Sequence, residues 1–427
     1  MLASRRLAPA SHPAIDLLDH DLFAEREPWE VFDVLRREAP VYWQDEPGGR
    51  GFWNVTRYHD VVAVLKDVKR FSSELGGVGQ IADLAPDELE ARRNFMELDP
   101  PRHTAYRRLF APDFTPRAVG RWADWLQGLI GDLLDDVLPR GELDWVDEVA
   151  RPIPIRVLGH IMGIPVEHHD RLVELGDRML VDTEPAFVGD RAFATPSDAH
   201  RLEPFGSPDA AELCGLGRRY YAERREHPQD DVLSLIANAR IDGCPLDERG
   251  LDNTFAIMVV AGNETTRQAI ALGTLALIEH PHELARLRAE PSLMGSAVDE
   301  LLRFTSPVWH FRRTATRDTE IAGQAIAAGD KVVVWFASAN RDPEAFADPD
   351  RLDLGRAPND HAVFGRGGPH FCLGAHLARL ELRVLLTELL PRIERIELAG
   401  RPVRVRSNFA NGLRSLPVRV TLAEALR

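Results

Sequence analysis

One segment of the chain, residues 251–278, constrains the fold more than any other. It carries a long helical pattern that is apolar on most faces, and a helix of this kind is stable only in the centre of a protein. The polar run "NETT" interrupts the pattern directly after Gly262, while Ile257, Ala261 and Thr265 fall on one face. Buried polar side chains cost free energy unless they are hydrogen-bonded or used in chemistry. The sequence therefore predicts a central helix that is either kinked around a hydrogen-bonded polar patch or shaped to let a ligand approach at Gly262.

A glycine-rich segment around Cys372 is the second unusual feature. The stretch "FGRGGPHFCLGAHLARLEL", which begins at Phe364, places a cysteine directly before a predicted helix over residues 374–390. Unpaired backbone N–H groups and the positive end of the helix dipole favour a thiolate at such a position, and glycines let the backbone turn tightly. A small buried cysteine without chemistry is the alternative interpretation.

Two sets of charged residues are open to both a functional and a structural interpretation. Glu300 and Arg303 in "DELLRF" have the i, i+3 spacing that on most helices gives only a surface ion pair worth about 0.2–0.5 kcal/mol. Four cationic residues on distant segments could together hold a dianionic ligand, or could be ordinary surface charges. This second set comprises His103, Arg107, Arg313 and His370.

Composition and charge narrow the class of protein. The 427 residues carry a formal net charge of −15, which argues against a surface that coats nucleic acid or an anionic membrane. The three cysteines, Cys214, Cys244 and Cys372, are far apart and do not form a disulfide or zinc pattern, so they indicate a reducing compartment. The N-terminal residues lack the apolar core of a signal peptide, and no apolar run reaches the roughly 20 residues of a membrane span. We therefore expect a cytoplasmic protein, and we separately expect a monomer.

The remaining pattern predicts a helix-rich chain with minor sheet. Helical periodicity covers residues 117–138, 156–162, 168–181, 209–226 and 293–304. Strand-like stretches cover residues 310–316, 319–323 and 331–336, and further stretches follow the last helix. Residues 72–97 indicate a mobile loop, and residues 185–208 indicate a lid or binding element. Because no linker divides the chain, we expect an N-terminal extension over residues 1–39 and one domain over residues 40–427.

Taken together and in this order, these features resemble the cytochrome P450 family, the thiolate-haem monooxygenases. The resemblance runs from about residue 40 to the C-terminus, and it includes "NRDPEAFADPDRLDLGR", which begins at Asn340. It implies a mainly α fold with small β-sheets, a helix-rich triangular prism. It also implies haem b, an iron protoporphyrin IX, as the cofactor and O2 as a co-substrate. Electrons would come from NAD(P)H through separate partners, a ferredoxin reductase and a ferredoxin.

The resemblance also implies roles for individual residues. Cys372 would be the proximal thiolate ligand of the haem iron, with Phe364 packed beside the haem. Glu264 and Thr265 would be an acid–alcohol pair that relays protons. The other implied haem contacts are His103, Arg107, Ala261, Arg313, His370 and Gly374. The implied substrate contacts are Ile257, Val260, Ala261 and Val308, together with the segments 72–97 and 185–208.

Two further details follow from the resemblance. Glu300 and Arg303 would form a buried ion pair that stabilises the haem side of the core, in place of the surface pair that the spacing alone suggests. The segment from Phe364 to Cys372 is one residue longer than usual, which leaves the exact contact of Phe364 open. Family members with a similar loop act on sterols and methyl-branched lipids, so we expect hydroxylation of a steroid, a terpenoid or a branched lipid.

Two other functions stay open at this point. One is a peroxide-driven peroxygenase of the same fold, and the other is a non-catalytic haem protein that binds a lipid. Peroxygenases commonly lack the acid–alcohol pair and a carrier has no use for it, so Glu264 and Thr265 favour a monooxygenase. Ferredoxins are typically acidic, so we expect a basic docking patch beside the cysteine. Its candidate residues are Arg107, Arg108, Arg366 and Arg379.

Overall fold

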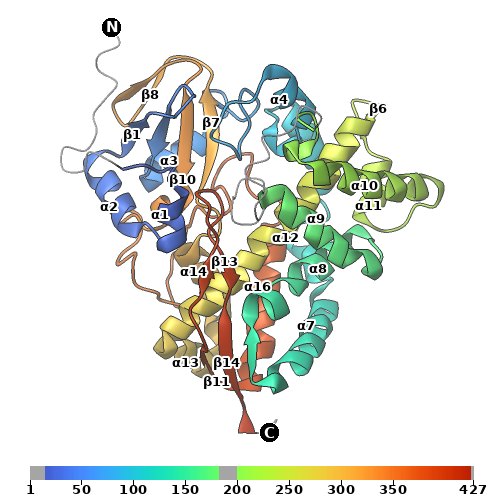
Figure 1. Ribbon diagram of the computed structural model, residues 1–427, viewed down its shortest axis with the longest axis vertical. Coiled ribbons are helices and arrows are strands. Elements are labelled where there is room, and N and C mark those ends of the chain that lie inside the picture. Colours follow the sequence, from blue (N-terminus) through green and yellow to red (C-terminus); the bar gives the residue numbers. More distant parts are fainter. Residues whose placement is uncertain (1–14, 182–199, 425–427) are drawn as a thin grey trace.

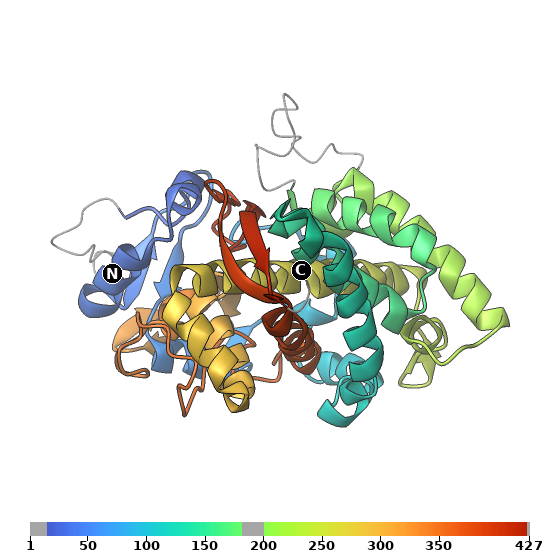
Figure 2. The same ribbon diagram turned by 90° about the horizontal axis from the view of Figure 1, so that it is seen from below.

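The structure is a computed structural model that describes residues 15–181 and 200–424, and the long apolar segment forms its central helix. Helix α12, Glu248–Glu279, crosses the molecule in two perpendicular views (Figures 1 and 2). The Asp247 carboxylate caps its first turn by accepting a hydrogen bond from the Gly250 N–H at 2.7 Å. Between Leu251 and Leu277 every residue is buried except Ala261, Gly262, Glu264 and Thr265. The predicted burial is thus confirmed, and the helix is open only at its polar interruption.

Several helices surround α12. Helices α8, α9, α10 and α14 all contact it, and their bounds are Pro152–Met162, His169–Val181, Pro208–Glu226 and Met294–Thr305. Helix α16, Ala375–Arg392, begins just after Cys372 and packs against α14 and against α7, Ala123–Val137. Shorter helices are α3 (Tyr58–Lys66), α4 (Pro86–Arg92), α5 (Arg102–Phe110), α6 (Pro116–Gly120), α11 (Val232–Ala237), α13 (Pro281–Ala289) and α15 (Phe336–Asn340).

A five-stranded sheet lies at the upper left of Figure 1, where its strands are drawn in blue and orange. Its strand order is β1 (Val41–Gln44), β2 (Phe52–Val55), β10 (Lys331–Trp335), β7 (His310–Ala315) and β3 (Phe71–Ser72). Strands β10 and β2 are parallel, and the other neighbours are antiparallel. Because side chains alternate along β7, Phe311 and Arg313 share one face of the sheet, whereas His310 and Arg312 share the other.

Smaller sheets complete the fold. Strand β14 (Pro417–Leu422) lies between β11 (Ile393–Leu398) and β4 (Glu142–Asp144). Strands β12 (Val403–Arg404) and β13 (Leu413–Ser415) form a hairpin whose second strand contacts α12. Two short ribbons pair β5 (Arg240–Ile241) with β6 (Cys244–Pro245) and β8 (Thr319–Ile321) with β9 (Gln324–Ile326).

The expected fold class, mainly α with minor β, is confirmed, although two segments differ from the sequence-based prediction. Residues 72–97, expected to be a loop, contain helix α4 and a short 3-10 helix, Phe95–Glu97. Proline at the first helical position starts α4, and so does the Glu88 carboxylate, which accepts a hydrogen bond from the Ala85 N–H at 2.9 Å; the glycines before the helix hide this signal. The segment 117–138 divides at Arg121 and Trp122 into α6 and α7.

The expected N-terminal extension packs against the five-stranded sheet through aromatic side chains. In the expected extension over residues 1–39, α1 (His20–Glu25) and α2 (Trp29–Glu38) pack Phe23 and Phe32 against Trp309 and Trp335. Most of the expected lid, residues 185–199, lies outside the described residues, and a 3-10 turn follows at Pro204–Gly206.

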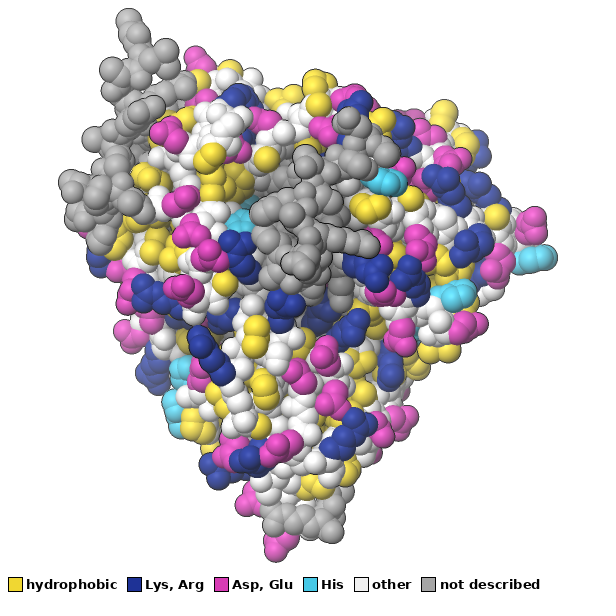
Figure 3. Space-filling view, in the orientation of Figure 1, with side chains coloured by type: hydrophobic (Ala, Val, Ile, Leu, Met, Phe, Trp, Pro, Cys, Tyr) yellow, Lys and Arg dark blue, Asp and Glu magenta, His cyan; other side chains and the backbone are white. Residues whose placement is uncertain are grey.

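Within the described ranges, no helix is both long and apolar enough to cross a membrane. The outline in Figure 3 is roughly triangular, with acidic and basic side chains interspersed over this face.

Candidate active site

The loop before α16 folds back on itself and presents the Cys372 sulfur. The Cys372 N–H donates a hydrogen bond to the Phe364 carbonyl at 2.8 Å, which closes the loop. Gly365 and Gly367 have φ angles of 75° and 79°, a left-handed backbone that favours glycine. The Gly374 N–H donates a hydrogen bond to the sulfur. These glycines therefore shape the loop and place an amide donor at Cys372.

The environment of Cys372 corrects one expectation. Burial raises the pKa of its thiol, and the Gly374 N–H, Arg107 and Arg379 offset this effect only in part. The sequence-based prediction of a favoured thiolate is therefore wrong for the polypeptide alone, because the desolvation outweighs the amide donor and the two cations. The side chain nevertheless keeps accessible surface. A metal ion bound at the sulfur would supply the missing positive charge and deprotonate the thiol.

Phe364 packs at the start of this loop. Its ring lies 4.5 Å below the Arg379 guanidinium and 5.7 Å from the His361 ring. Both of these residues bind the Asp299 carboxylate, Arg379 at 2.7 Å and His361 at 3.2 Å. Phe364 and Asp299 together therefore fix Arg379 beside the cysteine loop.

The four cationic residues from distant segments lie together. The rings of His103, on α5, and His370, in the cysteine loop, are 3.9 Å apart, centroid to centroid. Burial, Arg107 and Arg313 together lower the pKa of His103 to about 4. Burial and the same two arginines also lower the pKa of His370. The mutual repulsion shows that the four side chains share one small region.

This cation cluster (His103, Arg107, Arg313 and His370) lacks a matching set of acidic groups. Asp99 is the carboxylate that acts on His103 and Arg313. It already accepts hydrogen bonds from the Ser72 hydroxyl and, at 2.9 Å, from the Ser73 N–H. Among the described residues, His103 Nδ1 and Arg313 Nε are buried and have no hydrogen-bond partner. The cluster therefore suits a ligand with two negative charges.

Helix α12 is continuous through the polar interruption. The Thr265 hydroxyl donates a hydrogen bond to the Ala261 carbonyl at 2.9 Å, a contact that tends to bend a helix. Glu264 accepts a hydrogen bond from Gln268 at 2.7 Å and forms an ion pair with Arg267. The interpretation of a hydrogen-bonded polar patch is therefore partly right, because Glu264 and Thr265 have hydrogen-bond partners while Asn263 Oδ1, among the described residues, has none.

Gly262 does not open space for a ligand, in contrast to the sequence-based prediction. A Cβ atom at this position would lie 3.2 Å from Cδ1 of Leu158 on α8. The glycine therefore accommodates the packing of α8 against α12. The open face of the helix is the neighbouring one, formed by Ala261, Glu264 and Thr265.

A cavity of about 790 Å³ adjoins this open face. Its lining includes all four residues expected to contact substrate, namely Ile257, Val260, Ala261 and Val308. It also includes Glu264, Thr265 and much of the segment between Gly76 and Glu97. Sequence reasoning missed the C-terminal hairpin, which adds Phe409 and Ala410 to the wall. The stretch "SNFANG", which contains Phe409 and Ala410, has no periodicity that could place it at a cavity.

Glu300 and Arg303 form a fully buried ion pair, and each side chain is 0% exposed. Arg303 Nε donates to the Glu300 carboxylate at 2.7 Å and Nη2 donates at 2.9 Å. Arg356 and Asn359 also bind this carboxylate, at 3.1 and 3.0 Å. The surface-pair interpretation is therefore excluded. Sequence reasoning missed Arg356 and Asn359, because they lie far along the chain in an irregular segment.

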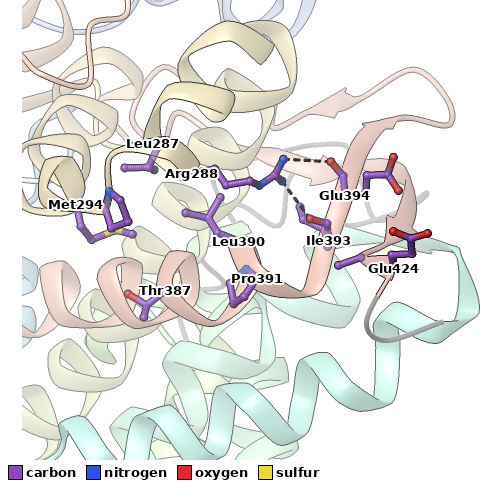
Figure 4. A pocket seen from close by; sticks show the side chains of 11 residues that line it. Leu287, Arg288, Met294, Thr387, Leu390, Pro391, Ile393, Glu394 and Glu424 are labelled. Atoms are coloured by element: carbon purple, nitrogen blue, oxygen red, sulfur yellow. Dashed lines mark hydrogen bonds between the residues drawn. The ribbon is translucent and has the colours of Figure 1, made fainter.

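A second depression, of about 870 Å³, lies between α13, α16 and β11 (Figure 4). Leu287, Met294 and Leu390 are part of its lining, and Arg288 donates hydrogen bonds to the Ile393 and Glu394 carbonyls at 3.1 and 3.2 Å. None of the site residues named above lines it. Within residues 15–181 and 200–424, no cluster of three or more His, Cys, Asp or Glu could hold a metal ion. The chemistry therefore concentrates around Cys372 and α12.

Comparison with known proteins gives consistent matches over nearly the whole chain. Residues 217–395 match the family model for Cytochrome P450. The chain is 36% identical to linalool 8-monooxygenase of Pseudomonas putida, over 94% of this chain and 98% of that protein. It is 37% identical to a methyl-branched lipid omega-hydroxylase of Mycobacterium bovis, over 91% and 90%. A Mycobacterium marinum cytochrome P450 in complex with pseudoionone superposes with a TM-score of 0.87 at 38% identity, over 96% and 100%.

Proposed function

Because the chain belongs to the cytochrome P450 family and is a monooxygenase of lipophilic compounds, we propose that it hydroxylates a terpenoid or a methyl-branched lipid. The observation that carries this proposal is that Glu264 and Thr265 open onto the same cavity as Ile257, Val260 and Val308. Potential proton donors and an apolar wall thus face one space. The net reaction would insert one atom of O2 into a C–H bond and release the other as water, consuming two electrons and two protons.

The residues present fit the haem that the family implies. Cys372 would ligate the iron, since its side chain is exposed at the end of the loop and an iron ion would stabilise its thiolate. The cation cluster would hold the two propionates, and the unpartnered Nδ1 of His103 and Nε of Arg313 would gain acceptors. When bound, haem supplies the electron-transfer and O2 chemistry that no side chain can perform.

Glu264 and Thr265 would handle protons. Both side chains are partly exposed on the open face of α12, so they can contact water in the cavity. A carboxyl group can carry a proton, and a hydroxyl can both accept one and donate another, so the pair forms a short relay. For Thr265 to take part, its hydroxyl would turn away from the Ala261 carbonyl.

The branched-chain substrate class is supported by what the relatives are named for. Linalool and methyl-branched lipids are both flexible chains that carry methyl branches. A cavity of about 790 Å³ is of the usual size for a small-molecule site. Ile257, Val260 and Val308 would exclude water and hold an alkyl chain through apolar contact. A steroid is the second candidate, because a steroid C26-monooxygenase of Mycobacterium bovis is 33% identical over 97% of this chain and 94% of that protein.

A ferredoxin, supplied with electrons by its reductase, would dock near the cysteine loop. Arg366 already pairs with Asp360 at 2.8 Å, and Arg379 pairs with Asp299 at 2.7 Å. Arg108 is exposed on α5, next to the half-buried Arg107. Exposed charges steer association with an oppositely charged partner, so Arg108 is the strongest docking candidate of the four.

The haem ligand can be tested by absorbance of the reduced, carbon monoxide-bound protein. Wild type should show the strongly red-shifted Soret band of thiolate ligation, and Cys372→Ser should abolish it. Cys244→Ser, which changes an exposed cysteine, is the matched control and should keep the band. A globin-like band in folded wild-type protein would overturn the assignment.

The substrate class can be tested by titration of the haem spin state with linalool, a methyl-branched fatty acid and a 3-keto steroid. The first two should produce the larger shift, and product should form with ferredoxin, its reductase and NAD(P)H. A shift with the steroid alone would replace the branched-chain class. Product formation with hydrogen peroxide at an equal rate, in the absence of ferredoxin, would favour a peroxygenase.

A further inference from the structure

Gln268 links the Glu264 carboxyl to another part of the chain. Its side chain is 2% exposed and makes two hydrogen bonds of 2.7 Å. Its Nε2 donates to Oε1 of Glu264, one turn earlier on α12, and its Oε1 accepts from the N–H of Leu413 at the start of β13. An amide can donate and accept at the same time, so one buried group joins the helix to the hairpin.

The hairpin is shaped to receive this side chain. A Cβ atom at Gly412 would lie 2.2 Å from Cδ of Gln268, a distance at which atoms overlap. The Gly412 carbonyl accepts a hydrogen bond from the Val405 N–H at 3.0 Å, which fixes the backbone of the hairpin at this level. The absence of a side chain at position 412 therefore lets the amide of Gln268 reach Leu413.

The same hairpin also forms part of the cavity wall. Phe409, Ala410 and Leu413 line the cavity, and so does Glu264. The Phe409 carbonyl accepts a hydrogen bond from the Trp309 N–H at 2.9 Å, and Ala410 pairs with Val308. A molecule in the cavity can therefore press on a segment that is joined to the carboxyl through a single buried side chain.

We propose that Gln268 is a positioning residue that couples the orientation of the Glu264 carboxyl to the cavity-lining hairpin, residues 405–413. When Phe409 and Ala410 move against a bound substrate, the Leu413 N–H moves with them and Gln268 transmits the shift to Glu264. The carboxyl then moves between its contact with Gln268 and the part of the cavity that Thr265 lines. The inference rests on the proposed proton-relay role of Glu264.

The chemistry of this link explains why a neutral amide suits position 268. Arg267 already neutralises the carboxylate as an ion-pair partner. A second cation would hold the carboxylate too strongly for a proton carrier, and an acid would repel it. The amide directs the carboxyl while leaving its charge unchanged.

Two substitutions distinguish the hydrogen bond of Gln268 to Glu264 from its hydrogen bond to the Leu413 N–H. Gln268→Met keeps the length of the side chain but removes both hydrogen bonds. Gln268→Glu keeps an acceptor for the Leu413 N–H but, when ionised, cannot donate to Glu264. The matched control is Gln127→Leu, which removes a Gln–Glu hydrogen bond of the same 2.7 Å length between α7 and α16.

The readouts are product formed per NAD(P)H consumed, the pH dependence of that ratio, and the substrate Kd from the spin-state titration. Gln268→Met should lower the ratio about threefold to tenfold while Kd changes less than twofold. Gln268→Glu should behave in the same way at pH 8 and recover as the pH falls, because the protonated carboxyl regains a donor. Gln127→Leu should leave the ratio unchanged.

A double substitution distinguishes this inference from the proposed role of Glu264 itself. Glu264→Gln alone should lower the ratio at least tenfold, and Glu264→Gln with Gln268→Met should be no worse. Independent, multiplying effects in the double variant would overturn the positioning role while leaving Glu264 as the relay. An unchanged ratio in Glu264→Gln would instead overturn the relay, and with it the inference. Gly412→Ala, which displaces the side chain of Gln268, provides an independent variant that should match Gln268→Met.

Discussion

Two buried groups of charged side chains differ in whether the polypeptide itself supplies all of their interaction partners. Around Glu300, the polypeptide supplies every partner: Arg303, Arg356, Asn359 and the Asp353 N–H all donate to one carboxylate, at 2.7 to 3.1 Å. The cation cluster has two arginines, two histidines whose pKa values are lowered and, within the described part of the chain, Asp99 as the nearby acid. The first set is complete when the chain folds, whereas we propose that the second is completed by an anionic ligand.

This difference follows from where the residues come from. Glu300 and Arg303 occupy one turn of α14, so their pairing forms together with the helix. The cation cluster draws on α5, β7 and the cysteine loop, so it forms only when three distant segments meet. Bringing like charges together in a buried place costs free energy. The first set therefore stabilises the fold, whereas the second is the region that we propose binds haem.

Glu300→Gln gives the largest expected effect. It leaves Arg303 and Arg356 without their buried carboxylate, and breaking one partner of a buried pair typically costs about 3–5 kcal/mol. We expect that loss in the free energy of unfolding, measured by denaturant titration, in both haem-free and haem-loaded protein. Glu30→Gln, in an exposed pair with Arg26, is the control and should change stability little. Equal, small losses in the two variants would show that the Glu300 network is not structural.

Arg313→Gln should change the free energy of unfolding in opposite directions in haem-free and haem-loaded protein. Glu300→Gln should instead destabilise both forms. Removing Arg313 takes away a buried cation whose pKa is lowered by desolvation, so haem-free protein should become slightly more stable. Haem-loaded protein should lose about 1.5–3 kcal/mol, the usual worth of a hydrogen bond to a charged group. Unfolding of the haem-free form and haem transfer to apomyoglobin measure the two effects.

The neighbouring residue provides the control for this comparison. Arg312 points to the other face of β7 and donates hydrogen bonds to the Ile81 and Ala82 carbonyls at 2.9 Å and to Asp83 at 2.7 Å. Arg312→Gln should therefore destabilise both forms alike. If Arg313→Gln did the same, the cluster would be a structural feature and not a ligand site.

The sequence predicts the parts of this molecule that depend on local pattern. Short sequence segments are enough to predict helix α12, its polar interruption at Glu264 and Thr265, and the position of Cys372 before α16. The meeting of His103 with His370 is not, because it depends on how α5 packs beside the cysteine loop. The pKa direction of Cys372 also escaped prediction, since burial outweighs the nearby donor and cations. Local pattern thus places these elements along the chain, whereas the balance of long-range effects depends on the fold.

His310 gives the smallest expected effect and extends the comparison to a buried group with no partner at all. Both of its ring nitrogens lack a hydrogen-bond partner among the described residues, and burial, with a smaller effect of His20, lowers its pKa to about 3. An unfolded histidine has a pKa of about 6.5, so the unfolded state binds the proton first as the pH falls. Stability should therefore be full above about pH 7 and decline by about 1–2 kcal/mol on going to pH 5.

His310→Phe should remove this part of the pH dependence, because phenylalanine cannot titrate and can keep the edge contacts with Trp335 and Phe409. Denaturant unfolding of both proteins at pH 7 and pH 5 measures the difference. The exposed His282 supplies the control, since His282→Phe should leave the slope unchanged. An unaltered slope in His310→Phe would mean that a bound polar group satisfies the imidazole, so that position 310 belongs with the cation cluster as a site completed by a ligand. A reduced slope would instead place His310 in a third category: a buried group that avoids the cost of an unpaired charge by remaining neutral.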